Sequence, residues 1–159
     1  MKRFLLLFLA TVVTAWSASA QLSVSQLRTE HLTDPVGIGE RRPLLSWEVS
    51  DASRRGVTQS AYEIRVKSGG RTVWRTGKVA SAESAGVFYD GTPLTSDTRY
   101  TWQVRVWDDR GKASAWSRPA FWRTGLFDVG EWQARWIEPA VSDDLAAMFR
   151  RTFRVTKPV

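Results

Sequence analysis

Apolar and polar side chains alternate along most of the chain between residues 22 and 125. The run at 100–107, YTWQVRVW, places one Tyr, one Trp and two Val on one face, and Thr, Gln, Arg and Trp on the other. A period of two is typical of a β-strand with one buried and one solvated face. Comparable runs predict further strands at 22–30, 43–49, 61–67, 71–76, 86–89 and 115–123. No stretch of this region has a helical period, so the pattern predicts an all-β fold.

Glycine, proline and aspartate separate these runs. Residues 69–70 are Gly-Gly, which is typical of a tight hairpin turn. The DDRG sequence at 108–111 supplies similar turn chemistry after the 100–107 strand, and 115–123 is expected to return as its antiparallel partner. The segment 34–39 contains Pro and two Gly and is predicted to be a loop, because these residues interrupt a strand ladder.

Seven short strands at intervals near ten residues are typical of an antiparallel β-sandwich of the immunoglobulin or fibronectin type III kind. Leu94 stands six residues before Tyr100, which is similar to the tyrosine corner of such sandwiches, where the phenol hydroxyl bonds upstream backbone. Tyr100 is therefore expected to be structural. Alternation assigns Trp47 and Trp102 to core faces, and Trp74, on the strand that returns from the 69–70 turn, is also expected to be structural.

The strand at 61–67 is expected to turn its two faces to different surroundings. Its inward face should carry Tyr62, Ile64 and Val66, and its outward, solvated face should carry Glu63, Arg65 and Lys67.

Trp107 and Trp116 differ from the core tryptophans, because Trp107 falls on an outward face near the 108–111 turn and Trp116 lies almost across from it. Three roles are open for this pair: packing against a neighbouring domain, contact with a sugar ring, and cover for the local strands.

Residues 1–20 have the pattern of a secretory signal peptide. Lys2 and Arg3 precede an apolar run at 4–15, and the small residues ASA at 18–20 predict cleavage between Ala20 and Gln21. The apolar run is too short for a membrane span. Since the chain has no cysteine, it has neither a lipid-anchoring thiol nor a disulfide framework. We expect an exported protein, periplasmic or extracellular, without membrane association once the signal is removed.

The net charge of the whole chain is +7. Removal of Lys2 and Arg3 with the signal would lower it to about +5, because all acidic residues lie downstream. Basic residues alternate with acidic and apolar ones along the strands, which is typical of solvated sandwich faces and argues against a nucleic-acid partner.

The character of the sequence changes after residue 125. Two further strands are predicted at 131–138 and 146–155, but two isolated strands cannot bury an apolar face in water. The predicted organisation is a signal peptide at 1–20, a β-sandwich at 21–126, and a linker with the first strands of a truncated second β domain at 127–159.

An ordered series of motifs resembles the N-terminal fibronectin-III-like module of bacterial α-L-rhamnosidases of glycoside hydrolase family 78. In the sandwich region these are YEIRV at 62–66, VWRTGKV at 73–79, YDGTPL at 89–94, YTWQVRVWD at 100–108, WS at 116–117 and FWRTG at 121–125. The tail motifs EWQARWI at 131–137 and FRRTF at 149–153 are similar to the opening of the jelly-roll domain that follows this module.

The resemblance implies an active site in a later (α/α)6 barrel, where paired carboxylates hydrolyse terminal α-linked L-rhamnose with inversion. No residue here matches that barrel, so no catalytic, cofactor-binding or metal-binding residue is expected. Asp108-Asp109 and Asp143-Asp144 are interpreted as turn residues, and the lone His31 as solvated.

The sequence predicts a non-catalytic N-terminal portion of such an enzyme, with its downstream domains as partners and a rhamnose-containing glycan as a further candidate. Two alternatives are a free-standing carbohydrate-binding module and a fibronectin-like module that binds another protein.

Overall fold

The computed structural model describes residues 22–52, 54–138 and 148–154. The chain divides into two units, Met1–Phe127 and Asp128–Val159. Within the described ranges, no helix is long and apolar enough to cross a membrane.

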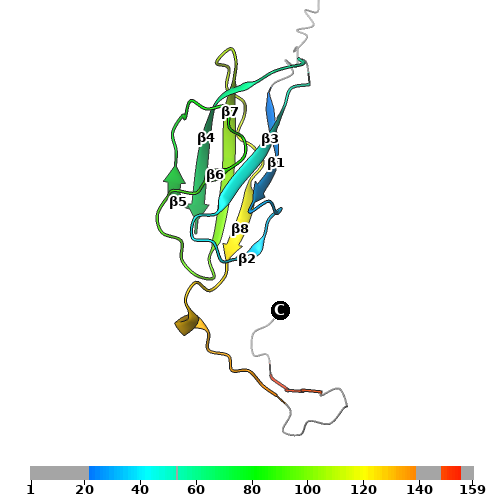
Figure 1. Ribbon diagram of the computed structural model, residues 1–159, viewed down its shortest axis with the longest axis vertical. Helices are drawn as coiled ribbons and strands as arrows, with labels where there is room; N and C mark the ends of the chain where they lie inside the picture. Colours follow the sequence, from blue (N-terminus) through cyan, green and yellow to red (C-terminus); the bar gives the residue numbers. More distant parts are fainter. Residues whose placement is uncertain (1–21, 53, 139–147, 155–159) are drawn as a thin grey trace, which may run out of the picture. The chain divides into compact units, whose positions relative to one another are not determined.

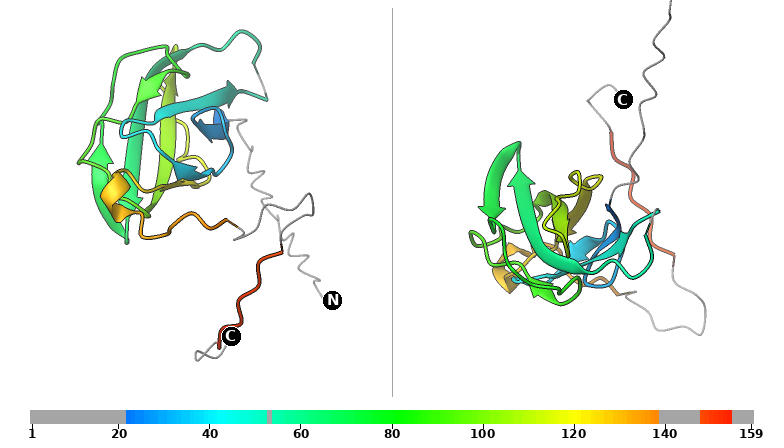
Figure 2. Two further views of the ribbon diagram at one scale, coloured as in Figure 1. Left: turned by 60° about the horizontal axis from the view of Figure 1, so that its bottom comes forward. Right: turned by 90° about the horizontal axis from the view of Figure 1, so that it is seen from above.

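The first unit is a sandwich of two β-sheets (Figures 1 and 2). The smaller sheet has the order β1-β3-β6, formed by Ser23–Thr29, Leu44–Ser50 and Val87–Phe88. The larger sheet has the order β2-β8-β7-β4-β5, formed by Val36–Ile38, Ala120–Thr124, Arg99–Asp108, Gln59–Ser68 and Arg71–Arg75. The predicted all-β sandwich is confirmed.

The long strands β4 and β7 form the centre of the larger sheet and pair antiparallel from Gln59 with Asp108 to Ser68 with Tyr100. The hairpin between β4 and β5 turns at Gly69 and Gly70, whose φ angles of 54° and 82° are in the left-handed region that glycine tolerates. The alternation in the sequence therefore predicted the main strands of the sheet correctly.

Two predictions about single strands were wrong. The segment 34–39 is not a loop throughout, because Val36–Ile38 forms the edge strand β2 and pairs parallel with β8. Pro35 is compatible with this edge, since its carbonyl accepts a hydrogen bond from the Arg123 N–H at 2.9 Å and no N–H is needed.

The strand predicted at 115–123 begins only at Ala120. Before that point two serines replace a regular ladder. The Ser114 N–H donates to the Val106 carbonyl, and the Ser114 hydroxyl accepts from the Val106 N–H at 3.0 Å. Ser117 bonds both backbone groups of Val104 in the same way. Side-chain oxygens therefore satisfy the edge of β7 where a continuous strand was expected.

The core between the sheets is rich in aromatic rings. Tyr100 stacks on Trp122 with ring centroids 5.4 Å apart, and Tyr89 meets Trp122 edge-on. Trp47 meets Tyr62 edge-on at 5.3 Å. Fully buried aliphatic residues fill the remaining space: Leu45, Ile64, Val66, Val104 and Val106. Such edge and offset contacts add to the burial of apolar area that stabilises the sandwich.

In the second unit the strands predicted at 131–138 and 146–155 are absent from the described residues. The unit has one 3-10 turn, Val129–Glu131, and no regular structure at 132–138 or 148–154. Residues 146, 147 and 155 of the second predicted strand lie outside the described residues. A strand needs a ladder partner, and none pairs with these segments within the described ranges.

Candidate functional site

A row of alternating cations and indole rings lies on the outer face of the five-stranded sheet. In spatial order it comprises Arg65, Trp116, Arg105, Trp107 and Lys78, and we call it the cation–π ladder. The Arg65 and Arg105 guanidinium carbons lie 4.2 and 4.9 Å from the Trp116 ring centroid. Arg105 and the Lys78 ammonium lie 5.0 and 4.8 Å from the Trp107 ring centroid. All four distances are within the range of a cation–π attraction.

The register of β4 and β7 brings these residues together. Arg105 lies opposite Glu63, and Trp107 lies opposite the small, buried Ala61. Residues that face each other across a strand pair share one face of the sheet, so odd-numbered positions from Ala61 to Lys67 and from Thr101 to Trp107 point outward. Lys78 comes from the segment after β5 and reaches the same face.

Gln103 links the ladder to the irregular segment that carries Trp116. Its Oε1 accepts hydrogen bonds from the Arg65 Nε and a terminal guanidinium nitrogen at 3.1 and 2.7 Å. Its Nε2 donates to the Ser117 carbonyl at 2.7 Å. One amide therefore orients the Arg65 guanidinium and also fixes the backbone next to Trp116.

Glu63 lies beneath the ladder, and its side chain is only 3% exposed. Its carboxylate accepts a hydrogen bond from Arg75 Nε at 2.6 Å and another from Arg105 Nε at 2.8 Å. Burial raises the pKa of this carboxyl, but the hydrogen bonds and positive charges of Arg75 and Arg105 outweigh burial, and the net pKa is lowered. The prediction that Glu63 is solvated was wrong, because the two arginines and their aliphatic stems cover it.

The structure places the other candidate residues as follows. Trp47 and Trp102 are buried, and Trp47 Nε1 donates to Gln59 Oε1 at 3.0 Å. The Tyr100 hydroxyl accepts a hydrogen bond from the Thr95 N–H at 2.9 Å, the geometry of a tyrosine corner. Trp74 is half-buried and meets Tyr89 edge-on. The proposed cleavage residues Ala20 and Gln21 lie outside the described residues.

Trp107 and Trp116 are half-buried and do not form a bare platform, because two cationic side chains lie over each ring. Alternation in the sequence places Arg65 and Trp107 on outward faces, but it does not predict that Arg65 lies over the Trp116 ring or that Arg105 and Lys78 lie over the Trp107 ring. The alternation of the 100–107 run places Arg105 and Trp107 on one face, but Trp116 and Lys78 reach that face from segments outside the strands, and no local pattern in the sequence indicates this.

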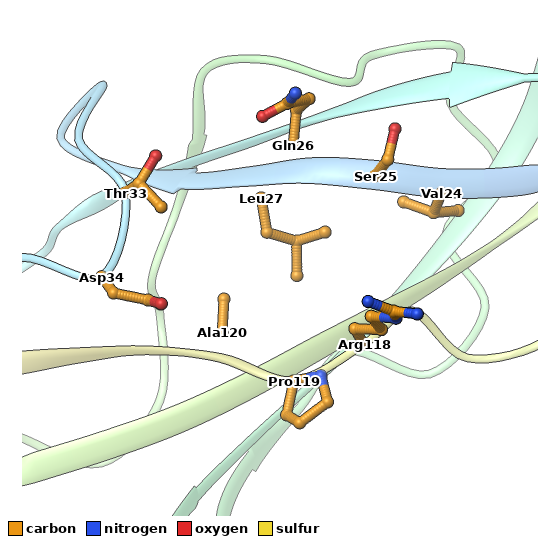
Figure 3. Close-up of a pocket in the computed structure, with 9 residues that line it drawn as sticks. All are labelled: Val24, Ser25, Gln26, Leu27, Thr33, Asp34, Arg118, Pro119 and Ala120. Atoms are coloured by element: carbon orange, nitrogen blue, oxygen red, sulfur yellow. The ribbon is translucent and has the colours of Figure 1, made fainter.

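A pocket of about 580 Å³ lies between β1 and the segment that leads into β8 (Figure 3). Leu27 and Ala120 lie in its middle, and Asp34 and Arg118 lie toward its two ends. Asp34 is the one carboxylic acid that lines it, and its Oδ1 accepts a hydrogen bond from the Phe121 N–H at 2.9 Å. A glycosidase site needs two carboxyl groups across the scissile bond, and this pocket does not provide them.

The paired acids at the end of β7 have a structural role. Asp108 accepts hydrogen bonds from the N–H groups of Lys112 and Arg110, and Arg54 bridges Asp108 and Asp109 at 3.1 and 3.0 Å. The Lys112 N–H bond lowers the pKa of the Asp108 carboxyl most, and burial opposes it. These are turn contacts, as predicted from the sequence. Asp143 and Asp144 lie outside the described residues, and His31 is exposed.

Comparison with known proteins connects this sandwich to one family. Residues 24–128 match the family described as the Rha78A-like, N-terminal immunoglobulin domain. An α-L-rhamnosidase of Streptomyces avermitilis is 44% identical over 121 residues, which cover 73% of this chain and 12% of that protein. An α-L-rhamnosidase of Formosa agariphila is 35% identical over 139 residues, which cover 80% of this chain and 14% of that protein.

Solved structures agree with these matches. The crystal structure of the Streptomyces avermitilis α-L-rhamnosidase complexed with L-rhamnose has a TM-score of 0.71 at 43% identity, covering 75% of this chain and 12% of that one. The α-L-rhamnosidase from Dictyoglumus thermophilum has a TM-score of 0.69 at 33% identity, covering 73% and 14%. This chain therefore spans only about an eighth of its relatives, and it belongs to the family of N-terminal immunoglobulin domains of α-L-rhamnosidases.

Proposed function

We propose that this chain is the exported, non-catalytic N-terminal part of an α-L-rhamnosidase that removes terminal α-linked L-rhamnose with inversion. The observation that carries the proposal is the match of residues 24–128 to the N-terminal domain of enzymes eight times longer than the matched region. The pattern of residues 1–20 supports export to the periplasm or the medium.

The second unit supports a continuation into another β domain. Its described residues expose several large apolar side chains, at Trp132, Trp136, Ile137, Met148, Phe149 and Phe153. Apolar residues at this density need partners to bury them. We propose that they belong to the opening of a jelly-roll domain and pack within it.

The role of the sandwich in this proposal is to hold the following domains in a fixed position beside the catalytic barrel. The cation–π ladder and the Glu63 ion pairs fix the outer face of the larger sheet, which suits a rigid spacer. A free-standing sugar-binding module is less well supported, because a sugar ring stacks on a bare aromatic face and the Trp107 and Trp116 rings already have cations over them.

The test is the intact mass and the activity of the native secreted protein, captured with an antibody against the sandwich. A protein several times larger than this chain of 18.0 kDa that hydrolyses p-nitrophenyl α-L-rhamnoside is expected. The chain alone is expected to have no activity on this substrate. A secreted species no larger than the chain, or a large one inactive on the rhamnoside, would contradict the proposal.

A further inference from the structure

We propose that the outer face of the five-stranded sheet binds an acidic polysaccharide. This basic face is defined by seven cationic side chains: Arg65, Lys67, Arg75, Lys78, Arg99, Arg105 and Arg123. That the polyanion is a glycan rests on the proposed function, whereas the charge of the surface and its arrangement come from the structure alone.

The basic face concentrates the charge of the protein. Among the residues that the structure describes, two carboxylates form ion pairs with these seven cations, those of Glu63 and Asp97, which leaves a net charge of about +5 on this face when counted at neutral pH. The whole chain, with 23 basic and 16 acidic residues, carries +7. One sheet surface therefore has most of the excess positive charge, and the remaining residues are nearly neutral together.

The register of the strands places these cations close to one another. Arg65 pairs with Arg75, and Arg99 pairs with Arg123. Side chains on one face are separated by roughly 5 Å across neighbouring strands and roughly 7 Å along a strand. These spacings are shorter than the Debye length of about 8 Å at physiological ionic strength, so the fields of neighbouring cations add at the surface.

Most of these cations remain available to a ligand. Lys67, Lys78 and Arg99 are exposed, and the Arg75 side chain is 60% exposed. Arg99 lies 3.8 Å from the Phe121 ring centroid, a contact that orients the guanidinium, and an uncharged ring does not neutralise it. Planar guanidinium groups held in this way match carboxylate and sulfate oxygens, which accept two parallel hydrogen bonds.

The same contacts distinguish an acidic polysaccharide from single-stranded nucleic acid and from neutral sugar. Nucleobases and neutral sugar rings are bound largely by stacking on open aromatic faces. On the basic face, Trp107, Trp116 and Phe121 each already lie under cationic side chains. The surface therefore offers charge and hydrogen-bond donors rather than stacking platforms, and it fits a polymer with repeating carboxylate or sulfate groups.

The test is binding of the full chain to polygalacturonate, measured by affinity electrophoresis, with dextran as the neutral polymer. We expect retardation by polygalacturonate, none by dextran, and loss of retardation at 0.5 M NaCl because the contacts are screened. The double variant Lys67→Glu and Arg99→Glu should weaken binding about tenfold or more, since two cationic contacts become repulsive.

The matched control is Arg28→Glu with Arg55→Glu, which changes the net charge equally at exposed positions outside the basic face. It should bind within about twofold of the original chain. If net charge alone determined binding, this control would instead lose as much affinity as the Lys67→Glu and Arg99→Glu variant. Thermal unfolding checks that both double variants are folded. If the Lys67→Glu and Arg99→Glu variant is unfolded, the milder Lys67→Gln and Arg99→Gln variant replaces it.

Equal loss in both double variants, no binding at low salt, or equally tight binding to a single-stranded DNA of matched charge would overturn the proposal. Each of these results is independent of rhamnosidase activity in the native protein. Failure of this inference and failure of the proposed function are therefore separable.

Discussion

Replacement of Glu63 by glutamine is the sharpest test of the interactions beneath the cation–π ladder. The carboxylate joins Arg75 and Arg105, whose side chains are 60% and 32% exposed. A hydrogen bond to a charged group contributes about 1.5–3 kcal/mol when it is shielded, and an exposed ion pair about 0–1 kcal/mol. Most of the loss in stability should therefore come from the weakened interaction with Arg105. Since glutamine keeps one acceptor oxygen, we expect the free energy of unfolding to fall by about 2 kcal/mol.

For a domain of this size, such a change lowers the melting temperature by about 10 °C, measured by circular dichroism. The control is Glu48→Gln, the same change at an exposed position of β3, which should alter stability by less than about 0.5 kcal/mol.

The dependence on pH provides an independent check. The pKa of Glu63 is lowered in the folded state, so its contribution is fully present above the pKa of the unfolded chain and is lost as pH falls through the folded pKa. The difference in stability between the original chain and Glu63→Gln should be constant near neutral pH and shrink below about pH 4.3. A difference that stays the same from pH 7 to pH 3, or one no larger than that of Glu48→Gln, would refute the reasoning.

Two further substitutions test the corner and the core. Tyr100→Phe removes the acceptor of the Thr95 N–H and should lower the free energy of unfolding by about 1 kcal/mol in urea, whereas an unchanged midpoint would show that the corner hydrogen bond is not stabilising. Gly91→Ala would place a Cβ 2.5 Å from Trp74 Cβ and should cost about 2 kcal/mol or more, while Gly39→Ala, with no atom within 4 Å of its Cβ, should cost far less. Equal effects at the two glycines would contradict the close packing at Gly91.

The sequence was most informative where one strand has one buried face. Alternation located β4 and β7 and assigned Trp47 and Trp102 to the core, because a period of two follows directly from strand geometry. It located β2 poorly, because a three-residue edge strand is too short to show a period and its pairing depends on the distant β8.

The arrangement of the candidate site was less predictable, because it depends on register between strands. Alternation gave the face on which Glu63 lies, but its burial results from Arg105 and Arg75, which are 42 and 12 residues away in the sequence. The segment before β8 differs from the predicted strand for a similar reason: residues 115–119 were expected to pair with β7, yet the hydroxyls of Ser114 and Ser117 take the place of backbone groups in the ladder. Long-range partners decide both cases, and a single sequence does not specify them.

The cations of the cation–π ladder lie beside indole rings, and this affects the charge of the whole outer face. A carboxylate beside each arginine would fix the guanidinium and also neutralise it, whereas an indole ring orients the cation and leaves its charge in place. Arg65 and Lys78 are held in this second way, whereas Arg105 contacts the Trp107 and Trp116 rings and also pairs with Glu63, the one carboxylate in contact with the ladder among the described residues. The indole rings thus orient Arg65 and Lys78 without cancelling their positive charges. Local cover of the strands and a charged binding surface are therefore compatible roles for the same tryptophans, because the rings order the cations that a polyanion would meet.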